Sequence, residues 1–351
     1  MSFKTFIKML FIKSSLDKNQ GRKHYDENYS ELYKLDENAD KSLQNSYYFS
    51  GHSSTGQSLV FRLGERNQSN SEIWFAYSDG IGNDYICAHQ NAEHDQTMID
   101  VSCVEPGKKW KIQFTGGITP GTKTPLNIWS NPKGIRIIPT VFDGEFTATQ
   151  KIFDYSKDMD TRPIARALAQ EKSSKPILEE ISNNNQVYYE QSGILKGVLN
   201  LSGKKIEIDM PVIRNRSFGK RDWNNMDRHI HICALTNNQT VNINMVGYSS
   251  IKELQAGYII NNNKVVCLDS CTSMEEISTD GKISSKFEFL AKFMGGKKLV
   301  IKCEKQSVFE FPFDNGIYTI YEGTAKFDIN GTKARGVIQF GYNSDNSRWI
   351  K

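Results

Sequence analysis

Residues 206–212, with the sequence IEIDMPV, alternate apolar with polar side chains and indicate the fold class of the chain. In an extended strand the apolar side chains of this run lie on one face, and Glu207 and Asp209 lie on the other. The same period of two recurs in VNINM (241–245) and in FEFLAKF (287–293). We therefore predict strands with one buried face throughout this half.

The N-terminal half shows weaker versions of the same alternation, at residues 59–63 and 109–114. Short turn sequences separate the runs in the second half, namely Ser202-Gly203, Asp280-Gly281, Gly295-Gly296 and Asn330-Gly331. Pairs of this kind close tight hairpins between antiparallel strands. The chain is therefore predicted to be mainly β, with antiparallel sheets or barrels in both halves.

A single helical segment interrupts this pattern near the middle of the chain. Thr161 can cap a helix, Pro163 suits its first turn, and residues 163–172 (PIARALAQEK) are mostly good helix formers. The 351 residues suit two domains, since domains usually contain about 100–200 residues. We predict an N-terminal arm (1–40), a first β domain (41–157), a helical connector (158–187) and a second β domain (188–351).

Composition excludes several classes of function. The chain has 44 Lys and Arg against 40 Asp and Glu, and a net charge of +4 is too small to predict a nucleic-acid partner. No apolar run approaches the roughly 20 residues of a transmembrane helix. The 6 cysteines include no CxxC pair, so neither a disulfide framework nor a zinc cluster is indicated, and we expect a soluble cytoplasmic protein.

The first 23 residues are strongly basic. They contain six Lys and Arg residues against one acid, Asp17, around the apolar group at 6–12. Lys8 interrupts that group, whereas a secretory signal needs a longer apolar core. We interpret the segment as an amphipathic arm, with peripheral docking on anionic lipid as the weaker alternative.

The densest polar information lies at YYEQSG (188–193), RNRSFGKRDW (214–223) and RHIH (228–231). These segments resemble a family of tandem lipocalin-like proteins related to hydroxyneurosporene synthase and the AttH-type domains, whose second half carries YEQxG, RDxSxGxRDW and RH motifs. The resemblance extends over most of the chain, but only 189–231 is specific. The chain departs from the family pattern at Asn215 and Arg216, where the pattern has Asp and His.

The resemblance implies a fold and a class of chemistry. The expected fold is two antiparallel lipocalin-like β-barrel halves packed together, with one short connecting helix and an apolar ligand cavity. Related proteins are thought to hydrate or cyclise polyenes and other apolar metabolites. Because Asn215 and Arg216 remove a proton donor of the pattern, Asp222 becomes the main acid candidate.

General chemistry agrees with this expectation. Burial in an apolar cavity raises the pKa of a carboxyl group, which can then protonate an alkene or a carbonyl near neutral pH. Glu190 and Asp222 are the two predicted catalytic carboxyls. Aromatic rings can stabilise a cation. The predicted ligand-binding residues are Tyr189, Gln191, Arg214, Phe218, Arg221, Trp223, Arg228, His229 and His231.

Structural explanations exist for the same residues. Arg221 with Asp222, or Arg214 with Glu190, could form a buried ion pair that only joins strands. Trp223 could fill a core. His229 and His231 share a strand face, but no third ligand is apparent, so no metal is predicted.

Three functions remain open, and the sequence does not rank the first two. The chain is a cofactor-independent hydratase, cyclase or isomerase, or a carrier of a lipid or isoprenoid, or a module whose barrels are filled by their own side chains. No cofactor is predicted, because no phosphate-binding glycine loop, GxSxG elbow or HExxH motif occurs.

Overall fold

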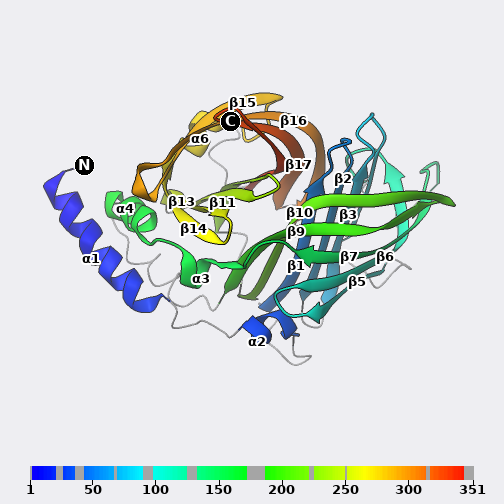
Figure 1. Cartoon of the computed structure of the whole chain (residues 1–351), viewed down its shortest axis with the longest axis horizontal. Helices are drawn as coiled ribbons and strands as arrows, with labels where there is room; N and C mark the ends of the chain where they lie inside the picture. The colour runs from blue at the N-terminus through cyan, green and yellow to red at the C-terminus, as the bar shows by residue number, and fades with distance from the viewer. Residues whose placement is uncertain are drawn as a thin grey trace.

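The chain folds into two antiparallel β structures with a few helices around them (Figure 1). The computed structural model describes residues 2–20, 27–35, 43–66, 69–89, 98–124, 133–171, 186–220, 225–249, 251–313 and 317–343. Most of these residues belong to strands, which confirms the predicted mainly β class.

The first sheet contains ten strands. They are β1 (Leu43–His52), β2 (Ser58–Arg66), β3 (Ser69–Ser78), β4 (Asp84–His89), β5 (Met98–Glu105), β6 (Lys109–Pro120), β7 (Ile138–Ala148), β8 (Phe153–Asp154), β9 (Val187–Leu201) and β10 (Lys204–Lys220). Their order is β10-β1-β2-β3-β4-β6-β7-β9-β8, and β5 pairs with β6. Because β9 also pairs with β10, the series of pairings returns to its first strand.

The second sheet is a closed eight-stranded barrel. Its strands are β11 (Met226–Leu235), β12 (Gln239–Tyr248), β13 (Ile251–Asn261), β14 (Lys264–Cys271), β15 (Lys286–Phe293), β16 (Lys298–Phe313), β17 (Tyr318–Ile329) and β18 (Thr332–Asn343). The short helix α6 (Met274–Ile277) follows β14, and the 3-10 turn Met294–Gly296 follows β15.

Each β structure has its own apolar interior. Rings such as Phe61, Phe75 and Phe142 form the core enclosed by the first sheet, and side chains such as Ile243 and Phe327 form that of the barrel. Both cores are built from the alternate positions of the strands, as the period of two predicts. An eight-stranded barrel has an interior that side chains of this size can fill.

The division between the sheets differs from the predicted domain boundary at residue 188. β9 and β10 form a long hairpin that pairs with β7 through residues 193–201 and with β1 through residues 212–220. The hairpin therefore belongs to the first sheet, and the chain passes to the barrel between Lys220 and Met226. The boundary is set by the pairing of β10 with β1, which is distant in sequence. The sequence around residue 188 therefore carries no local indication of it.

Four helices lie at the N-terminus and in the middle of the chain: α1 (Phe3–Asn19), α2 (Glu27–Leu32), α3 (Tyr155–Asp158) and α4 (Arg162–Gln170). The helix predicted at 163–172 is confirmed as α4, although the Thr161 hydroxyl donates to Asp17 instead of capping it. The part of the predicted connector from 172 to 185 lies outside the described residues. None of the helices described combines the length and apolarity of a membrane-crossing segment.

The outer faces of the two β structures pack against each other. Tyr48 and Trp74 of the first sheet share a buried cluster with Phe311 and Ile320 of the barrel. The rings of Trp74 and Phe311 stack with their centroids 4.4 Å apart. The outward faces of β1 and β3 are therefore as buried as their inward faces.

Candidate functional site

A cavity of about 340 Å³ lies between the outer faces of the first sheet and the barrel, next to α3 and α4. Apolar side chains on its wall include Trp74, Ile164, Met226, Val246, Leu254 and Ile320. Polar side chains on its wall include Tyr48, Tyr155, Tyr188, His229, His231 and Gln339. The wall exposes more apolar than polar surface but carries many polar side chains, and at this volume the cavity suits a small molecule with an apolar skeleton and several polar groups.

This cavity lies between the two β structures and not inside the barrel. On β11 the side chains of Ile230 and Ile232 belong to the barrel core, whereas His229 and His231 alternate with them and line the cavity. The same alternation on β12 directs Asn244 to the cavity. The barrel interior holds a core of buried apolar side chains, so we take the inter-sheet cavity as the ligand candidate.

Glu190 on β9 lies directly behind the cavity wall and is completely buried. Its Oε1 accepts a hydrogen bond from the Tyr188 hydroxyl at 2.7 Å, and its Oε2 accepts one from the Tyr155 hydroxyl at 2.9 Å. The Tyr258 hydroxyl also donates to Oε2, at 3.2 Å, and His231 Nε2 is 3.4 Å from Oε1. Glu190 therefore reaches the cavity through Tyr155, Tyr188 and His231, which line it.

The surroundings of Glu190 determine the protonation of its neighbours. Burial, together with the negative charge of Glu190, raises the pKa of Tyr155 and of Tyr258 well above the usual value, so both phenols keep their protons at neutral pH. Burial lowers the pKa of His231, although the Glu190 charge opposes this. The wall near Glu190 therefore offers the protonated phenol of Tyr155 beside the neutral imidazole of His231.

A second carboxyl, Glu322 on β17, is buried between the sheets. The hydroxyls of Tyr48 and Ser50 donate to its Oε1 at 2.6 and 3.0 Å, and Gln339 Nε2 donates to its Oε2 at 2.6 Å. Burial raises the pKa of Glu322 to about 7. Because Tyr48 and Gln339 line the cavity, Glu322 is connected to the cavity wall by hydrogen bonds through these two side chains.

His229 joins the same set of contacts through Gln339. Gln339 Oε1 lies 2.8 Å from His229 Nε2, and the Tyr318 hydroxyl lies 2.7 Å from His229 Nδ1. Sequence reasoning missed Tyr48, Tyr155, Tyr188 and Glu322. Glu322 could have been found as the only acid in the aromatic run YTIYEG (318–323).

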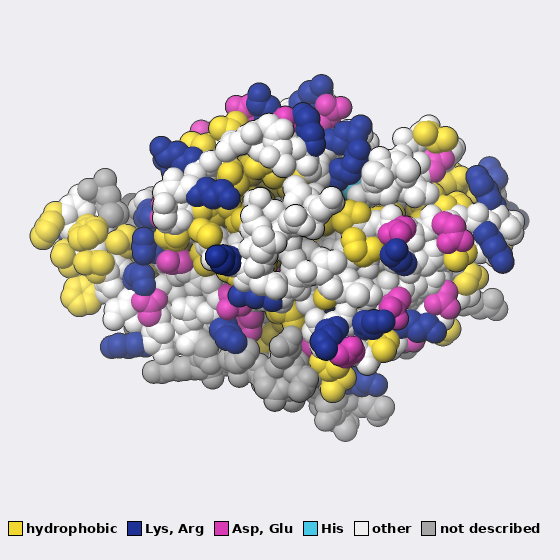
Figure 2. Space-filling model, in the orientation of Figure 1, with side chains coloured by type: hydrophobic (Ala, Val, Ile, Leu, Met, Phe, Trp, Pro, Cys, Tyr) yellow, Lys and Arg dark blue, Asp and Glu magenta, His cyan; other side chains and the backbone are white. Residues whose placement is uncertain are grey.

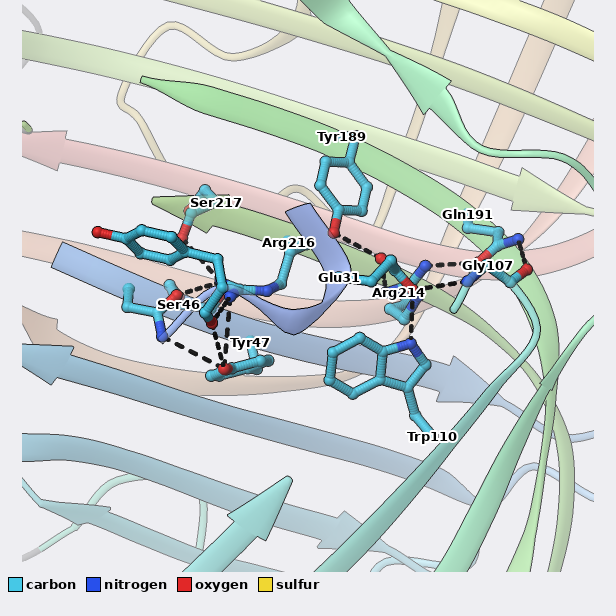
Figure 3. A network of polar contacts seen from close by, with 12 residues as sticks. Glu31, Ser46, Tyr47, Gly107, Trp110, Tyr189, Gln191, Arg214, Arg216 and Ser217 are labelled. Atoms are coloured by element: carbon cyan, nitrogen blue, oxygen red, sulfur yellow. Dashed lines mark hydrogen bonds and ion pairs between the residues drawn. The ribbon is translucent and has the colours of Figure 1, made fainter. Parts of the chain in front are cut away.

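Several predicted binding residues join a buried polar network around Glu31 (Figure 3), on the face of the β9–β10 hairpin that alternation places opposite Glu190. Arg214 Nη1 forms a buried ion pair with Glu31 of α2 at 2.8 Å, and Gln191 Oε1 accepts from Arg214 Nη2 at 2.6 Å. The Tyr189 hydroxyl and Trp110 Nε1 donate to the same Glu31 carboxylate. These contacts hold α2 against the first sheet, so the alternative pairing of Arg214 with Glu190 is wrong.

Two further predicted residues also lie away from the cavity wall. The Phe218 ring stacks on Tyr33 at 4.2 Å. Arg228 is buried, and its Nη2 donates to the carbonyl oxygen of Ser278, next to α6, at 2.8 Å. Arg221, Asp222 and Trp223 lie outside the described residues. The structure thus places His229 and His231 on the cavity wall and Glu190 one contact behind it.

Comparisons with solved structures agree with this architecture. A protein of Nitrosomonas europaea provisionally named AttH shares 10% identity over 90% of this chain and 96% of its own, with a TM-score of 0.57. CghA in complex with Sch210972 shares 5% identity over 86% and 88%, with a TM-score of 0.51. Kievitone hydratase from Nectria haematococca shares 13% identity over 89% and 93%, with a TM-score of 0.48.

The fold is therefore similar to that of the protein provisionally named AttH, with a closed eight-stranded barrel beside a second antiparallel sheet. Residues 35–345 match a family model described as a domain of unknown function (DUF7064), and the chain belongs to that family. A comparison with curated proteins gave no match.

Proposed function

We propose that the chain binds an apolar small molecule between its two sheets and catalyses its hydration, cyclisation or isomerisation by proton transfer. The observation that carries this proposal is the pair of phenols, Tyr155 and Tyr188, which line the cavity and both donate to the buried Glu190. Proton donors held beside an apolar wall are what acid catalysis on an alkene or a carbonyl requires.

The ligand class follows from the cavity wall. Trp74, Val246 and Leu254 can bury an apolar skeleton, whereas the phenols and the two histidines can bind a few oxygen atoms. CghA, which has the same fold, provides a structural precedent, because its structure is a complex with the small molecule Sch210972. An isoprenoid, a polyene or a lipid-like compound of suitable size fits this description.

Proton transfer proceeds through the phenols in this proposal. With Glu190 in its acid form, a phenol of the pair transfers its own proton to the substrate and takes up the proton of the Glu190 carboxyl group, so that no phenolate forms beside the carboxylate. Isomerisation or cyclisation returns one proton from a neighbouring carbon, and hydration returns one from the added water, so the protein ends unchanged. The tyrosine rings can stabilise the intermediate cation. General acid catalysis of this kind contributes about 10²–10⁴-fold to a rate.

Carriage without chemistry is the alternative, and one observation favours it. The hydroxyls of Tyr155, Tyr188 and Tyr258 already have a protein acceptor in Glu190, and Asn215 Nδ2 donates to the Tyr188 hydroxyl at 2.7 Å. A saturated network of this kind can also serve only to hold strands and fix the cavity shape. A carrier needs the cavity but does not need a proton to move.

The test begins with the ligand. The protein is purified from a host rich in isoprenoids and extracted, and retained compounds are identified by mass spectrometry. We expect an apolar compound in the extract, or a product of a supplied one. Intact ligand that is never converted supports the carrier, and neither binding nor conversion with any apolar compound contradicts both functions.

Variants then test the proton donors. With an active preparation, E190Q and Y155F are expected to lower conversion by about 10²-fold or more, because each removes one part of the relay. Y77F is the matched control, because the Tyr77 hydroxyl contacts Gln57 and belongs to the interior of the first sheet. D222N tests the predicted role of Asp222. Unchanged conversion in both E190Q and D222N would contradict both predicted acids.

A further inference from the structure

Helix α1 exposes a continuous apolar stripe. Each stripe side chain has between 37% and 81% of its surface exposed, and the members are Phe3, Phe6, Ile7, Leu10 and Phe11. Their spacing of three and four residues places them on one side of the helix. Figure 2 shows apolar side chains gathered at the end of the molecule where Figure 1 places α1.

The opposite side of α1 is fixed to the protein. Met9 and Ile12 are buried in a cluster with Leu168 of α4 and Ile251 of β13. Lys8 Nζ also donates to the carbonyl oxygen of Glu171, just beyond α4, at 2.7 Å. The helix cannot bury its stripe by rotating without exposing this second apolar face. Exposure of the stripe costs solvation free energy, and none of the segments that the structure describes covers it, so we look for a partner outside the chain.

Charge indicates the nature of that partner. Lys4, Lys8, Lys13 and Lys18 lie along α1. The only acid of the helix, Asp17, pairs with Lys13 at 2.5 Å. An apolar stripe bordered by basic residues combines the two signals that bind a helix to the interface of an anionic bilayer.

We propose that α1 docks the protein on an anionic lipid surface, with the stripe of Phe3, Phe6, Ile7, Leu10 and Phe11 in the interfacial layer. The other side of the helix stays attached to α4 and β13. The buried cluster that joins α1 to α4 and β13 also contacts Ile164 and Leu254, which line the cavity. Docking thus brings the cavity close to the membrane that dissolves apolar compounds. Uptake of ligand from that membrane rests on the proposed function, whereas docking itself does not.

Vesicle sedimentation tests the stripe. The full chain is mixed with phosphatidylcholine vesicles that contain or lack phosphatidylserine. We expect binding to the anionic vesicles only, and a loss of roughly tenfold or more in F3S/F11S, because two exposed rings no longer enter the interface. I81S/V104S is the matched control, because Ile81 and Val104 are exposed apolar residues of the first β structure. The control is expected to bind like the wild type.

A charge series tests the second signal. K4E/K18E is expected to weaken binding, and added salt is expected to weaken the wild type in the same direction. K297E/K298E removes two exposed lysines beside β15 and is expected to have little effect. Circular dichroism confirms that each variant is folded.

The proposal is overturned if the wild type does not bind anionic vesicles, or if F3S/F11S binds them as well as the wild type. It is also overturned if the wild type is a dimer in analytical ultracentrifugation and F3S/F11S is a monomer. The last result would assign the stripe to a second copy of the chain. Ligand retention, measured on the same preparations without vesicles, separates failure of docking from failure of the proposed function.

Discussion

A buried carboxylate lies on each face of strand β9, and the two carboxylates have different partners. On the face toward the interior of the first sheet, Tyr189 donates to Glu31, which pairs with the Arg214 guanidinium. On the face toward the barrel, Glu190 meets three phenols and a neutral histidine. A carboxylate paired with a guanidinium, such as Glu31 with Arg214, serves to hold two elements together, and we call this ion pair the structural joint. A carboxylate surrounded by phenols beside a cavity can exchange protons with them.

The pKa of Glu31 supports this contrast. Burial opposes ionisation, but the charge and hydrogen bond of Arg214 outweigh it and hold the pKa of the Glu31 carboxyl below its usual value. Glu31 therefore remains charged near neutral pH and is committed to its ion pair. Proton transfer at this site is not expected, although four predicted binding residues, Tyr189, Gln191, Arg214 and Phe218, lie at or near it.

The largest effect is expected when the structural joint is broken. R214A leaves the Glu31 carboxylate buried without its guanidinium, and we expect the free energy of unfolding to fall by about 3–5 kcal/mol. Urea unfolding followed by fluorescence measures this. K196A removes a lysine from an exposed pair with Asp209 and should change the free energy by about 1 kcal/mol or less. Equal effects in the two variants would show that the joint is not structural.

Adjacent tyrosines on opposite faces of β9 sharpen the comparison. Y188F removes a cavity phenol and is expected to lower conversion, or ligand retention if the protein is a carrier, by about tenfold or more. Y189F removes a donor to Glu31 and is expected to cost about 1–3 kcal/mol of stability without changing conversion. Turnover and urea unfolding are measured for both. The contrast fails if Y189F impairs conversion at full stability.

Glu322 predicts a pH dependence of stability. Its pKa of about 7 in the fold exceeds the usual carboxyl value of 4.5, so the folded protein binds the proton more tightly than the unfolded chain. The stabilisation is complete below pH 4.5 and is lost as pH rises toward 7, by about 3 kcal/mol over the window. His52, whose pKa burial lowers to about 4, acts in the opposite direction between pH 4 and 6.5.

The difference between wild type and E322Q therefore isolates the Glu322 contribution, because both proteins retain His52. Unfolding free energies at pH 5 and pH 7.5 are compared. We expect wild type to lose more stability over this interval than E322Q. Parallel pH profiles of the unfolding free energy in the two proteins would show that Glu322 does not titrate with a raised pKa in the fold.

The smallest effect is expected at Asn215. N215A removes one hydrogen bond to the Tyr188 hydroxyl and is expected to cost about 0.5–1.5 kcal/mol. Because Tyr188 lines the cavity, we expect ligand retention to change as well, which calorimetry with any identified ligand can measure. A large loss of stability with unchanged retention would assign Asn215 to the structural side of the comparison.

Part of the site was predictable from local sequence. Alternation on β9 separates Tyr188 and Glu190 from Tyr189 and Gln191, so the opposite faces of this strand follow from the period of two alone. The pattern did not indicate which face meets a cavity, because both faces carry buried polar residues. Tyr155 was missed because α3 is a short helix whose approach to β9 depends on contacts distant in sequence.

Local sequence patterns were enough to predict several of the strands, the hairpin turns at 202–203, 295–296 and 330–331, helix α4 and the basic apolar N-terminal segment, since periodicity and turn chemistry act over a few residues. The pair Asp280-Gly281 lies between α6 and β15 and does not close a hairpin. Three features depend on long-range contacts: the β9–β10 hairpin completes the first sheet, Arg214 meets Glu31, and the cavity lies between the sheets. Each of these depends on pairing or packing between segments far apart in the chain. The free energy of such contacts is shared by two distant segments, so neither segment alone reveals the contact.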